Sequence, residues 1–256
     1  MKLRRYKYLA LSLISIAVIF VAVNTITRGE RPPKEVNTKI EAPEYTYISP
    51  YIELSHYDTH FREAADSTGY DWTLIAAIAF TESRFDSTAV SSVGACGVMQ
   101  MMPATLRGFG IPDSLHVDNR TNILTAARLL ESYDKVFRRI KNNDERVKFV
   151  LASYNAGFGH ILDAMRLAEK HGYDKHVWHG SVDSFLVKKS LPEFYTDTLC
   201  RNGEFKDWKQ TLSFVNKVHR NWNKFNRKQK AYSDSIAIVV QDDTLKIIAE
   251  DSGMNI

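Results

Sequence analysis

The pattern of apolar and polar positions divides the chain into four parts. Residues 1–26 combine a basic start with an unbroken apolar run. Residues 27–50 are polar and contain four prolines, which predicts a semi-extended linker. Across residues 51–225 apolar side chains recur at helical spacing in most windows, so we expect one helical domain there. Residues 226–256 begin with a basic stretch and continue as a β-prone tail.

Several windows within the domain predict individual helices. Asp71 can cap a helix whose apolar positions are Leu74, Ile75, Ile78 and Ala79. Three further helices are expected around residues 123–137, 147–156 and 161–168, and Gly157 can terminate the second of them. The small and polar residues from Ser87 to Gly97 carry no period and predict a loop.

The tail has a different pattern. Apolar residues alternate on both sides of Asp242 and Asp243, from Ile236 to Ile247. Such alternation around a polar turn is typical of a short β-hairpin, so we expect one at the periphery of the domain.

Composition and charge fit a globular domain with attachments, since 44% of residues are hydrophobic, 25% are charged and the net charge is +4. The basic flank and apolar run of residues 1–26 predict export, with an uncleaved signal anchor preferred over a cleaved signal peptide. We therefore expect the domain in the periplasm or at the periplasmic face of the inner membrane. Cys96 and Cys200 could form a disulfide there or stay free, and the pattern decides neither this nor the oligomeric state.

Glu82 is the candidate catalytic residue because it interrupts the strongly apolar segment TLIAAIAFTESRF. Apolar surroundings disfavour the charged form of a carboxyl group and raise its pKa, as a general acid near neutral pH requires. The alternative is a glutamate on the solvated side of an amphipathic helix. Asp86 is the nearest second carboxylate, and we interpret it as a loop or capping residue.

Three separated motifs in a fixed order carry a resemblance. They are YDWTLIAAIAFTESRF at 70–85, AVSSVGACGVMQMMPAT at 89–105 and LASYNAGFGH at 151–160. The chain resembles the family 1 lytic transglycosylases with an SLT-type catalytic domain. The run HILDAMRLAEKHG, followed by Trp178, is similar to the membrane-bound lytic transglycosylase F branch, whose large N-terminal solute-binding-like domain has no counterpart here.

The resemblance covers about residues 51–225 and implies an all-α, lysozyme-like fold with a glycan-binding groove. It further implies cleavage of the MurNAc-β-1,4-GlcNAc bond of peptidoglycan without water, leaving a 1,6-anhydro-MurNAc end and needing no cofactor or metal. Glu82 matches the single general acid/base. The substrate-binding positions that match are Ser91, Met99, Gln100, Met102, Tyr154 and Asn155, and the structural motif positions are Ser83, Gly97 and Gly157.

Some of these assignments have structural alternatives. Met99, Met102 and Tyr154 could simply pack in the core, and a structural Gln100 would bond to the backbone of its own loop. The family often has a tyrosine that points toward the catalytic carboxyl where this chain has Phe214, which cannot donate a hydrogen bond. Two alternative functions stay open. One is a muramidase that uses water, and the other is a peptidoglycan-binding module without catalysis.

Two other patterns have weaker functional interpretations. His171, His176 and His179 lie close in sequence, but their spacing matches no strong zinc motif. The stretch from Lys217 to Lys230 mixes cations with aromatic residues, and we interpret it as a helix with a solvated basic face. We expect peptidoglycan strands and a membrane as partners, and no nucleic acid.

Overall fold

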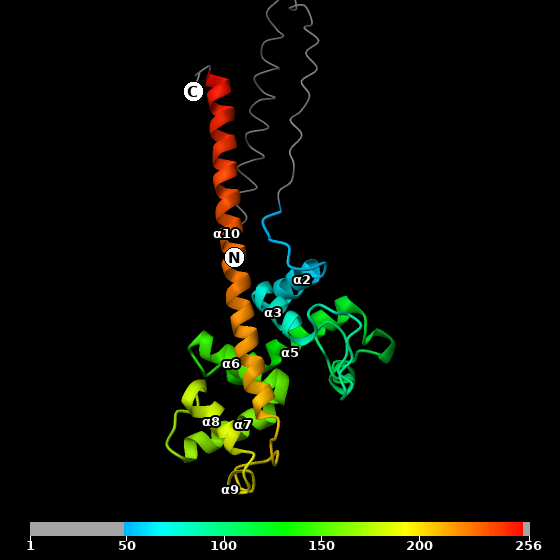
Figure 1. Cartoon of the computed structure of the whole chain (residues 1–256), viewed down its shortest axis with the longest axis vertical. Coiled ribbons are helices and arrows are strands. Elements are labelled where there is room, and N and C mark those ends of the chain that lie inside the picture. The colour runs from blue at the N-terminus through cyan, green and yellow to red at the C-terminus, as the bar shows by residue number, and fades with distance from the viewer. Residues whose placement is uncertain (1–48, 253–256) are drawn as a thin grey trace, which may run out of the picture. The chain divides into compact units, whose positions relative to one another are not determined.

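The computed structural model describes residues 49–252, with side chains as far as Ile236 (Figure 1). The predicted signal segment and nearly all of the predicted linker lie outside these residues. The described part is helical, with α2 Asp58–Thr68, α3 Trp72–Ser83, α4 Pro103–Gly108, η1 Asp113–Leu115, α5 Asn119–Phe137, α6 Asn143–Ala156, α7 Phe158–Lys170, η2 Trp178–Val182, α8 Asp183–Lys188, α9 Pro192–Tyr195 and α10 Trp208–Ser252. Residues 49–252 contain isolated β-bridges but no strand, so the all-α prediction is confirmed.

Helix α3 is central to the domain. The Asp71 side chain accepts a hydrogen bond from the Thr73 backbone N–H and so caps the helix. Every residue from Trp72 to Ala79 is buried, because α2 packs on one side of the helix and α10 on another. A helix that is apolar all round is stable only when it is enclosed in this way. Its last turn carries Glu82 and is the part that approaches the surface.

The helices predicted around residues 123–137, 147–156 and 161–168 correspond to α5, α6 and α7. Helix α6 ends at Ala156 because Gly157 takes a backbone φ of 83°, which side chains disfavour. Its N–H still bonds to the Ser153 carbonyl, so the turn is tight. This geometry brings α7, which begins within the third motif, back against α6.

The predicted hairpin is wrong, because residues 236–247 continue α10 (Figure 1). Residues 204–252 contain no glycine or proline, so nothing in the sequence terminates a helix that has already formed. The Asp242–Asp243 pair also lacks a glycine for the tight turn of a two-residue hairpin. Alternation over a few residues was therefore a poor guide to this segment.

The domain also extends past its predicted end at Phe225, which lies within α10. The Gln229 side chain accepts a hydrogen bond from the Ile52 N–H at 3.2 Å and donates one to the Pro50 carbonyl at 2.9 Å. These bonds fasten residues 49–57, the entry segment that precedes α2, to α10. None of the described helices is both long enough and apolar enough to cross a membrane.

A buried ion pair joins α7 to the segment after α8. The side chains of Asp163 and Lys189 have no exposed surface and are hydrogen bonded to each other. Asp163 also accepts hydrogen bonds from the backbone N–H groups of Arg201 and Asn202. Burial by itself raises the pKa of Asp163, but the bonds from Lys189, Arg201 and Asn202 outweigh it and lower the pKa to about 2. This one carboxylate therefore organises a long irregular segment.

The two cysteines do not form a disulfide, and the histidines weighed as zinc ligands contact other side chains. Both thiols are free, with Cys96 buried and Cys200 partly buried. His171 stacks on Phe185, while His179 is exposed and contacts Asp183. No group of three potential metal-ligating side chains occurs within the described residues.

Candidate functional site

Glu82 occupies the next-to-last position of α3, immediately before the helix ends. The chain leaves the helix through Arg84 and Phe85, both with positive φ, of 56° and 67°. Such a conformation is uncommon for residues with side chains, so the local fold imposes it to turn the chain sharply. The turn leaves the Glu82 side chain at the edge of the core, partly exposed.

The carboxyl group of Glu82 has unusual electrostatics. It has neither a hydrogen bond nor an ion pair within the described residues, and desolvation by the surrounding core raises its pKa to about 8. A carboxyl with this pKa holds its proton at neutral pH. The arrangement suits donation of a proton to a substrate oxygen, and it does not fit a solvated glutamate.

Two hydrogen bonds tie the loop after α3 to the last turn of α3 and to α6. The Ser83 hydroxyl donates to the Val98 carbonyl at 2.8 Å, and the Tyr154 hydroxyl donates to the next carbonyl, that of Met99, at 2.7 Å. The donor of the first bond, Ser83, follows Glu82 in the sequence, and the donor of the second, Tyr154, lies on α6. All three predicted motifs therefore converge on one stretch of backbone.

Tyr154 lies close enough to Glu82 for the two groups to affect each other. Burial raises the pKa of Tyr154 well above its ordinary value, and the charge of an ionised Glu82 raises it further. The Tyr154 ring also stacks on Phe214, with ring centroids 6.3 Å apart and planes 8° apart. Phe214 thus supports the tyrosine by packing, although it cannot donate a hydrogen bond to the carboxyl.

Asn122 is a positioning residue that the sequence pattern did not reveal. Its side chain is fully buried, accepts a hydrogen bond from the Met99 N–H and donates to the carbonyls of Cys96 and His116. A Cβ on Gly97 would come within 2.9 Å of this amide, and Gly97 has a φ of 76°. Asn122 and Gly97 together fix the loop, and only the folded contact between residues 25 positions apart reveals this.

The side chains of Ser91 and Gln100 form hydrogen bonds within the loop. The Ser91 hydroxyl accepts from the Ala95 N–H at 2.9 Å. Gln100 donates from Nε2 to the carbonyls of Ala89 and Gly97, at 2.9 and 3.0 Å. This is the bonding expected of a structural glutamine. A sugar contact of Gln100 stays a prediction that would depend on Oε1 alone.

We expect Gln100→Ala to destabilise the domain, because two loop carbonyls lose their donor. The loss should be about 1–3 kcal/mol, the usual effect of leaving partly buried polar groups unpaired. Thermal unfolding followed by circular dichroism measures it. A normal melting temperature combined with about tenfold slower glycan cleavage would instead assign Gln100 to sugar binding.

The remaining predicted substrate residues differ in their exposure. Met99 has no exposed side-chain surface and packs in the core, whereas Met102 is 40% exposed. Asn155 is partly exposed, and its Oδ1 accepts a hydrogen bond from the Thr211 hydroxyl of α10 at 2.8 Å. Only Met102 and Asn155 of these three can therefore offer a side chain to a ligand.

Asp86 is occupied by its own turn. Its carboxylate accepts hydrogen bonds from the backbone N–H and the hydroxyl of Thr88, at 2.8 and 2.7 Å. These bonds lower the pKa of Asp86 below its ordinary value. The residue is exposed and acts as a turn former, in contrast to Glu82.

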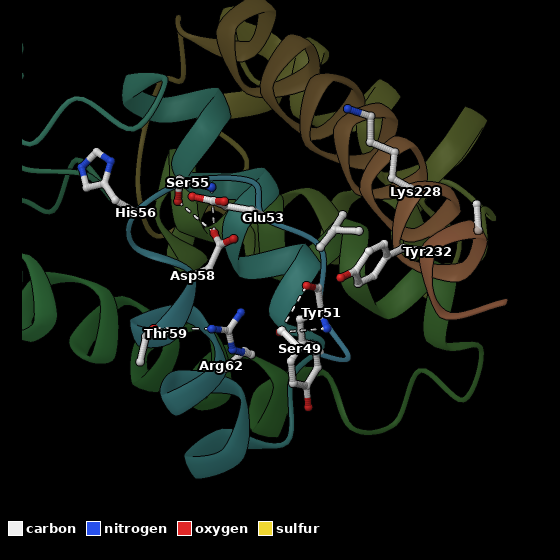
Figure 2. Close-up of a pocket in the computed structure, with 12 residues that line it drawn as sticks. Ser49, Tyr51, Glu53, Ser55, His56, Asp58, Thr59, Arg62, Lys228 and Tyr232 are labelled. Atoms are coloured by element: carbon white, nitrogen blue, oxygen red, sulfur yellow. Dashed lines mark hydrogen bonds between the residues drawn. The ribbon is translucent and has the colours of Figure 1, made fainter. Parts of the chain in front are cut away.

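A pocket of about 890 Å³ lies between residues 49–62 and α10 (Figure 2). The entry segment and α2 form one side of it, and Lys228 and Tyr232 of α10 form the other. Asp58 in its wall accepts hydrogen bonds from the backbone of Leu54 and Ser55, so this acid is also structural. None of the predicted site residues lines this pocket.

Comparisons with known proteins agree with the motifs. Residues 59–177 match the family model of the Transglycosylase SLT domain. Curated relatives include the membrane-bound lytic murein transglycosylases F of Desulfosudis oleivorans, 35% identical over 148 residues, and of Marinobacter nauticus, 39% identical over 146 residues. The matches cover 58% and 57% of this chain and 32% and 28% of the relatives. The chain thus spans about a third of the length of these relatives.

Two solved structures are also similar in part. An inactive mutant of the lytic transglycosylase Slt of Pseudomonas aeruginosa has a TM-score of 0.47 and 24% identity, covering 69% of this chain and 25% of its own. The 70 kDa soluble lytic transglycosylase of Escherichia coli has a TM-score of 0.46 and 22% identity, covering 67% and 24%.

Proposed function

We propose that this chain, which carries an SLT transglycosylase domain at residues 59–177, is a peptidoglycan lytic transglycosylase with Glu82 as its single general acid/base. The observation that carries the proposal is the Glu82 carboxyl, which is unpaired within the described residues and whose pKa is raised by desolvation to about 8. The names of the relatives support the reaction class.

One carboxyl can serve both halves of the reaction. Glu82 gives its proton to the oxygen between MurNAc and GlcNAc, and that C–O bond breaks while the N-acetyl carbonyl of MurNAc stabilises the anomeric carbon. The carboxylate then takes the proton of the C6 hydroxyl of the same MurNAc, whose oxygen bonds to the anomeric carbon. The GlcNAc hydroxyl and the 1,6-anhydro ring account for all atoms, and Glu82 ends protonated as it began.

The surroundings of Glu82 favour this route over hydrolysis by two carboxylates. An inverting or retaining glycosidase needs a second carboxyl across the scissile bond. The nearest candidate, Asp86, is exposed and held by Thr88. The pKa of Glu82 is raised by desolvation and not by a neighbouring acid, as it would be beside a partner carboxylate.

A groove that takes the reacting sugar should lie beside Glu82. We propose that Tyr154 and Asn155 from α6, Met102 after the loop, and the Ser91 and Gln100 region of the loop border it. Tyr154 lies within electrostatic range of Glu82. The intramolecular C6 hydroxyl reacts at a high effective concentration, so a groove that excludes water favours ring closure.

The release of soluble fragments from purified sacculi tests the proposal across pH. Because the free enzyme must carry the Glu82 proton, the rate should be constant below about pH 7 and fall tenfold per unit above a pKa of about 8. Circular dichroism at each pH separates this fall from unfolding. A rate that rises through pH 4–5 and stays high above pH 9 would mean that the ionised carboxylate acts first.

We further propose that the N-terminal segment holds the domain at the periplasmic face of the membrane. The basic flank and apolar run of residues 1–26 support this location. We expect the full chain in the membrane fraction, with its C-terminal part digested by protease only after the outer compartment is opened. Recovery of the chain in the cytosol would overturn the proposal.

A further inference from the structure

A second pocket lies against the end of α3. It has a volume of about 340 Å³ and is lined by Phe80, Thr81, Arg84, Lys217, Arg220 and Asn221. Three of these six residues are cations and none is acidic. The pocket therefore has a strong preference for an anion.

The three cations are available to a ligand. Arg84, Lys217 and Arg220 are exposed, and none of them forms an ion pair within the described residues. Arg84 is held with its guanidinium 5.5 Å from the centroid of the Phe80 ring. The neutral wall is fixed too, because the Asn221 amide donates to the Thr81 hydroxyl at 3.0 Å. The bond between Asn221 and Thr81 thus ties α10 to α3 at the pocket, and the three exposed cations lie beside it.

The residues that line the pocket are neighbours, along α3 and α10, of residues at the proposed site. Thr81 and Arg84 flank Glu82 in α3 and at its end. On α10, Lys217 follows Phe214 by three residues, so both lie on one face of that helix. Phe214 stacks on Tyr154, which feels the charge of Glu82. Lys217 at the pocket and Phe214 beside Tyr154 are thus about one turn apart on α10.

We propose that this pocket, formed by Arg84, Lys217 and Arg220, binds a carboxylate of the peptide stem that the cleaved strand carries. The proposal rests on the proposed function. In a peptidoglycan strand the sugars are neutral, since the lactyl group of MurNAc is in amide linkage, and the negative charges are the stem carboxylates. An arginine fork matches a carboxylate with two parallel hydrogen bonds. A stem leaving the sugar at the catalytic site meets the pocket next to it.

The test compares soluble, uncrosslinked strands in two forms. One form keeps its stem carboxylates, and in the other a carbodiimide with excess ammonium has converted them to neutral amides. The double variant Lys217→Ala/Arg220→Ala should raise KM for the carboxylate form about tenfold, with kcat within about twofold, as expected when charge-assisted bonds outside the reacting centre are lost. Cleavage of the amidated form should be unchanged.

The matched control is Lys224→Ala/Arg227→Ala, which removes the same charge from exposed positions of α10 outside the pocket. It should keep the wild-type preference for carboxylate strands. Equal losses on both forms of strand, no loss on either, or the same loss in the control would overturn the proposal.

Direct binding separates this inference from the proposed reaction. The Glu82→Gln chain, mixed with the two forms of fluorescently labelled strand, reports affinity without chemistry. A tighter Kd for the carboxylate form that the pocket variant abolishes supports the stem site even if the wild-type chain cleaves neither strand. Equal affinities for the two forms overturn the stem site even if both are cleaved.

Discussion

Replacing Glu82 by glutamine should slow glycan cleavage by about 10²- to 10⁴-fold, the range that general acid–base catalysis supplies. The amide has the shape of the carboxyl group and lacks the proton that the leaving oxygen needs. The nearest carboxyl in the sequence, that of Asp86, is held in its turn by Thr88 and is not free to replace it. Fragment release from sacculi measures the effect.

The matched control is Asp86→Asn, which should cleave at close to the wild-type rate. A second readout checks the fold. The pKa of Glu82 is raised from 4.5 to about 8, so the folded state binds its proton more tightly than the unfolded state; this contribution to stability is complete below pH 4.5 and is lost as pH rises through 8. Glu82→Gln should therefore melt no lower than wild type at pH 7. Substantial cleavage by this well-folded variant would remove Glu82 from its role.

Replacing Asp163 by alanine should destabilise the domain by about 3–5 kcal/mol, because it leaves the Lys189 ammonium buried without its partner. It also removes the acceptor of the Arg201 and Asn202 N–H groups. Urea unfolding followed by circular dichroism measures the change in free energy.

A surface ion pair provides the control for Asp163. Lys170 and Asp197 form a contact whose lysine is half-exposed, so Lys170→Ala should change stability little. The pH dependence has a definite sign. The pKa of Asp163 is lowered from 3.8 to about 2, so its stabilisation is present above 3.8 and lost as pH falls through 2. Equal stability of Asp163→Ala and wild type at pH 7 would contradict the account of this ion pair.

The sequence was sufficient where local chemistry decides the outcome. Three features depend only on residues within one or two turns of each other. They are the cap of α3 by Asp71, the apolar run of α3, and the end of α6 at Gly157. The unusual position of Glu82 also follows locally, because it interrupts that apolar run. The raised pKa expected for this carboxyl agrees with its surroundings in the structure.

Long-range contacts account for what the sequence could not predict. Asn122 is a polar residue next to the apolar face of α5, and only the folded loop makes it a donor to two carbonyls. Lys189 and Asp163 are ordinary surface residue types that burial turns into a pair. Gln100 has the motif position of a sugar ligand, but its amide is directed to Ala89 and Gly97 by the turn it occupies.

The tail was predicted incorrectly for a related reason. The alternation from Ile236 to Ile247 satisfies a strand pattern over a few residues, while helix propagation from α10 acts over the whole segment. Extending a formed helix costs less than nucleating a new element, and no helix breaker intervenes. A sequence window long enough to include residues 208–235 would have favoured a continued helix.

The mass of the products tests the central claim most directly. Purified sacculi are digested with the full chain, and the soluble fragments are compared by mass spectrometry with those of a muramidase. The account predicts fragments one water lighter, ending in 1,6-anhydro-MurNAc, and their absence with Glu82→Gln. Fragments of full mass with reducing MurNAc ends would show that water attacks the anomeric carbon and would contradict the transglycosylase mechanism.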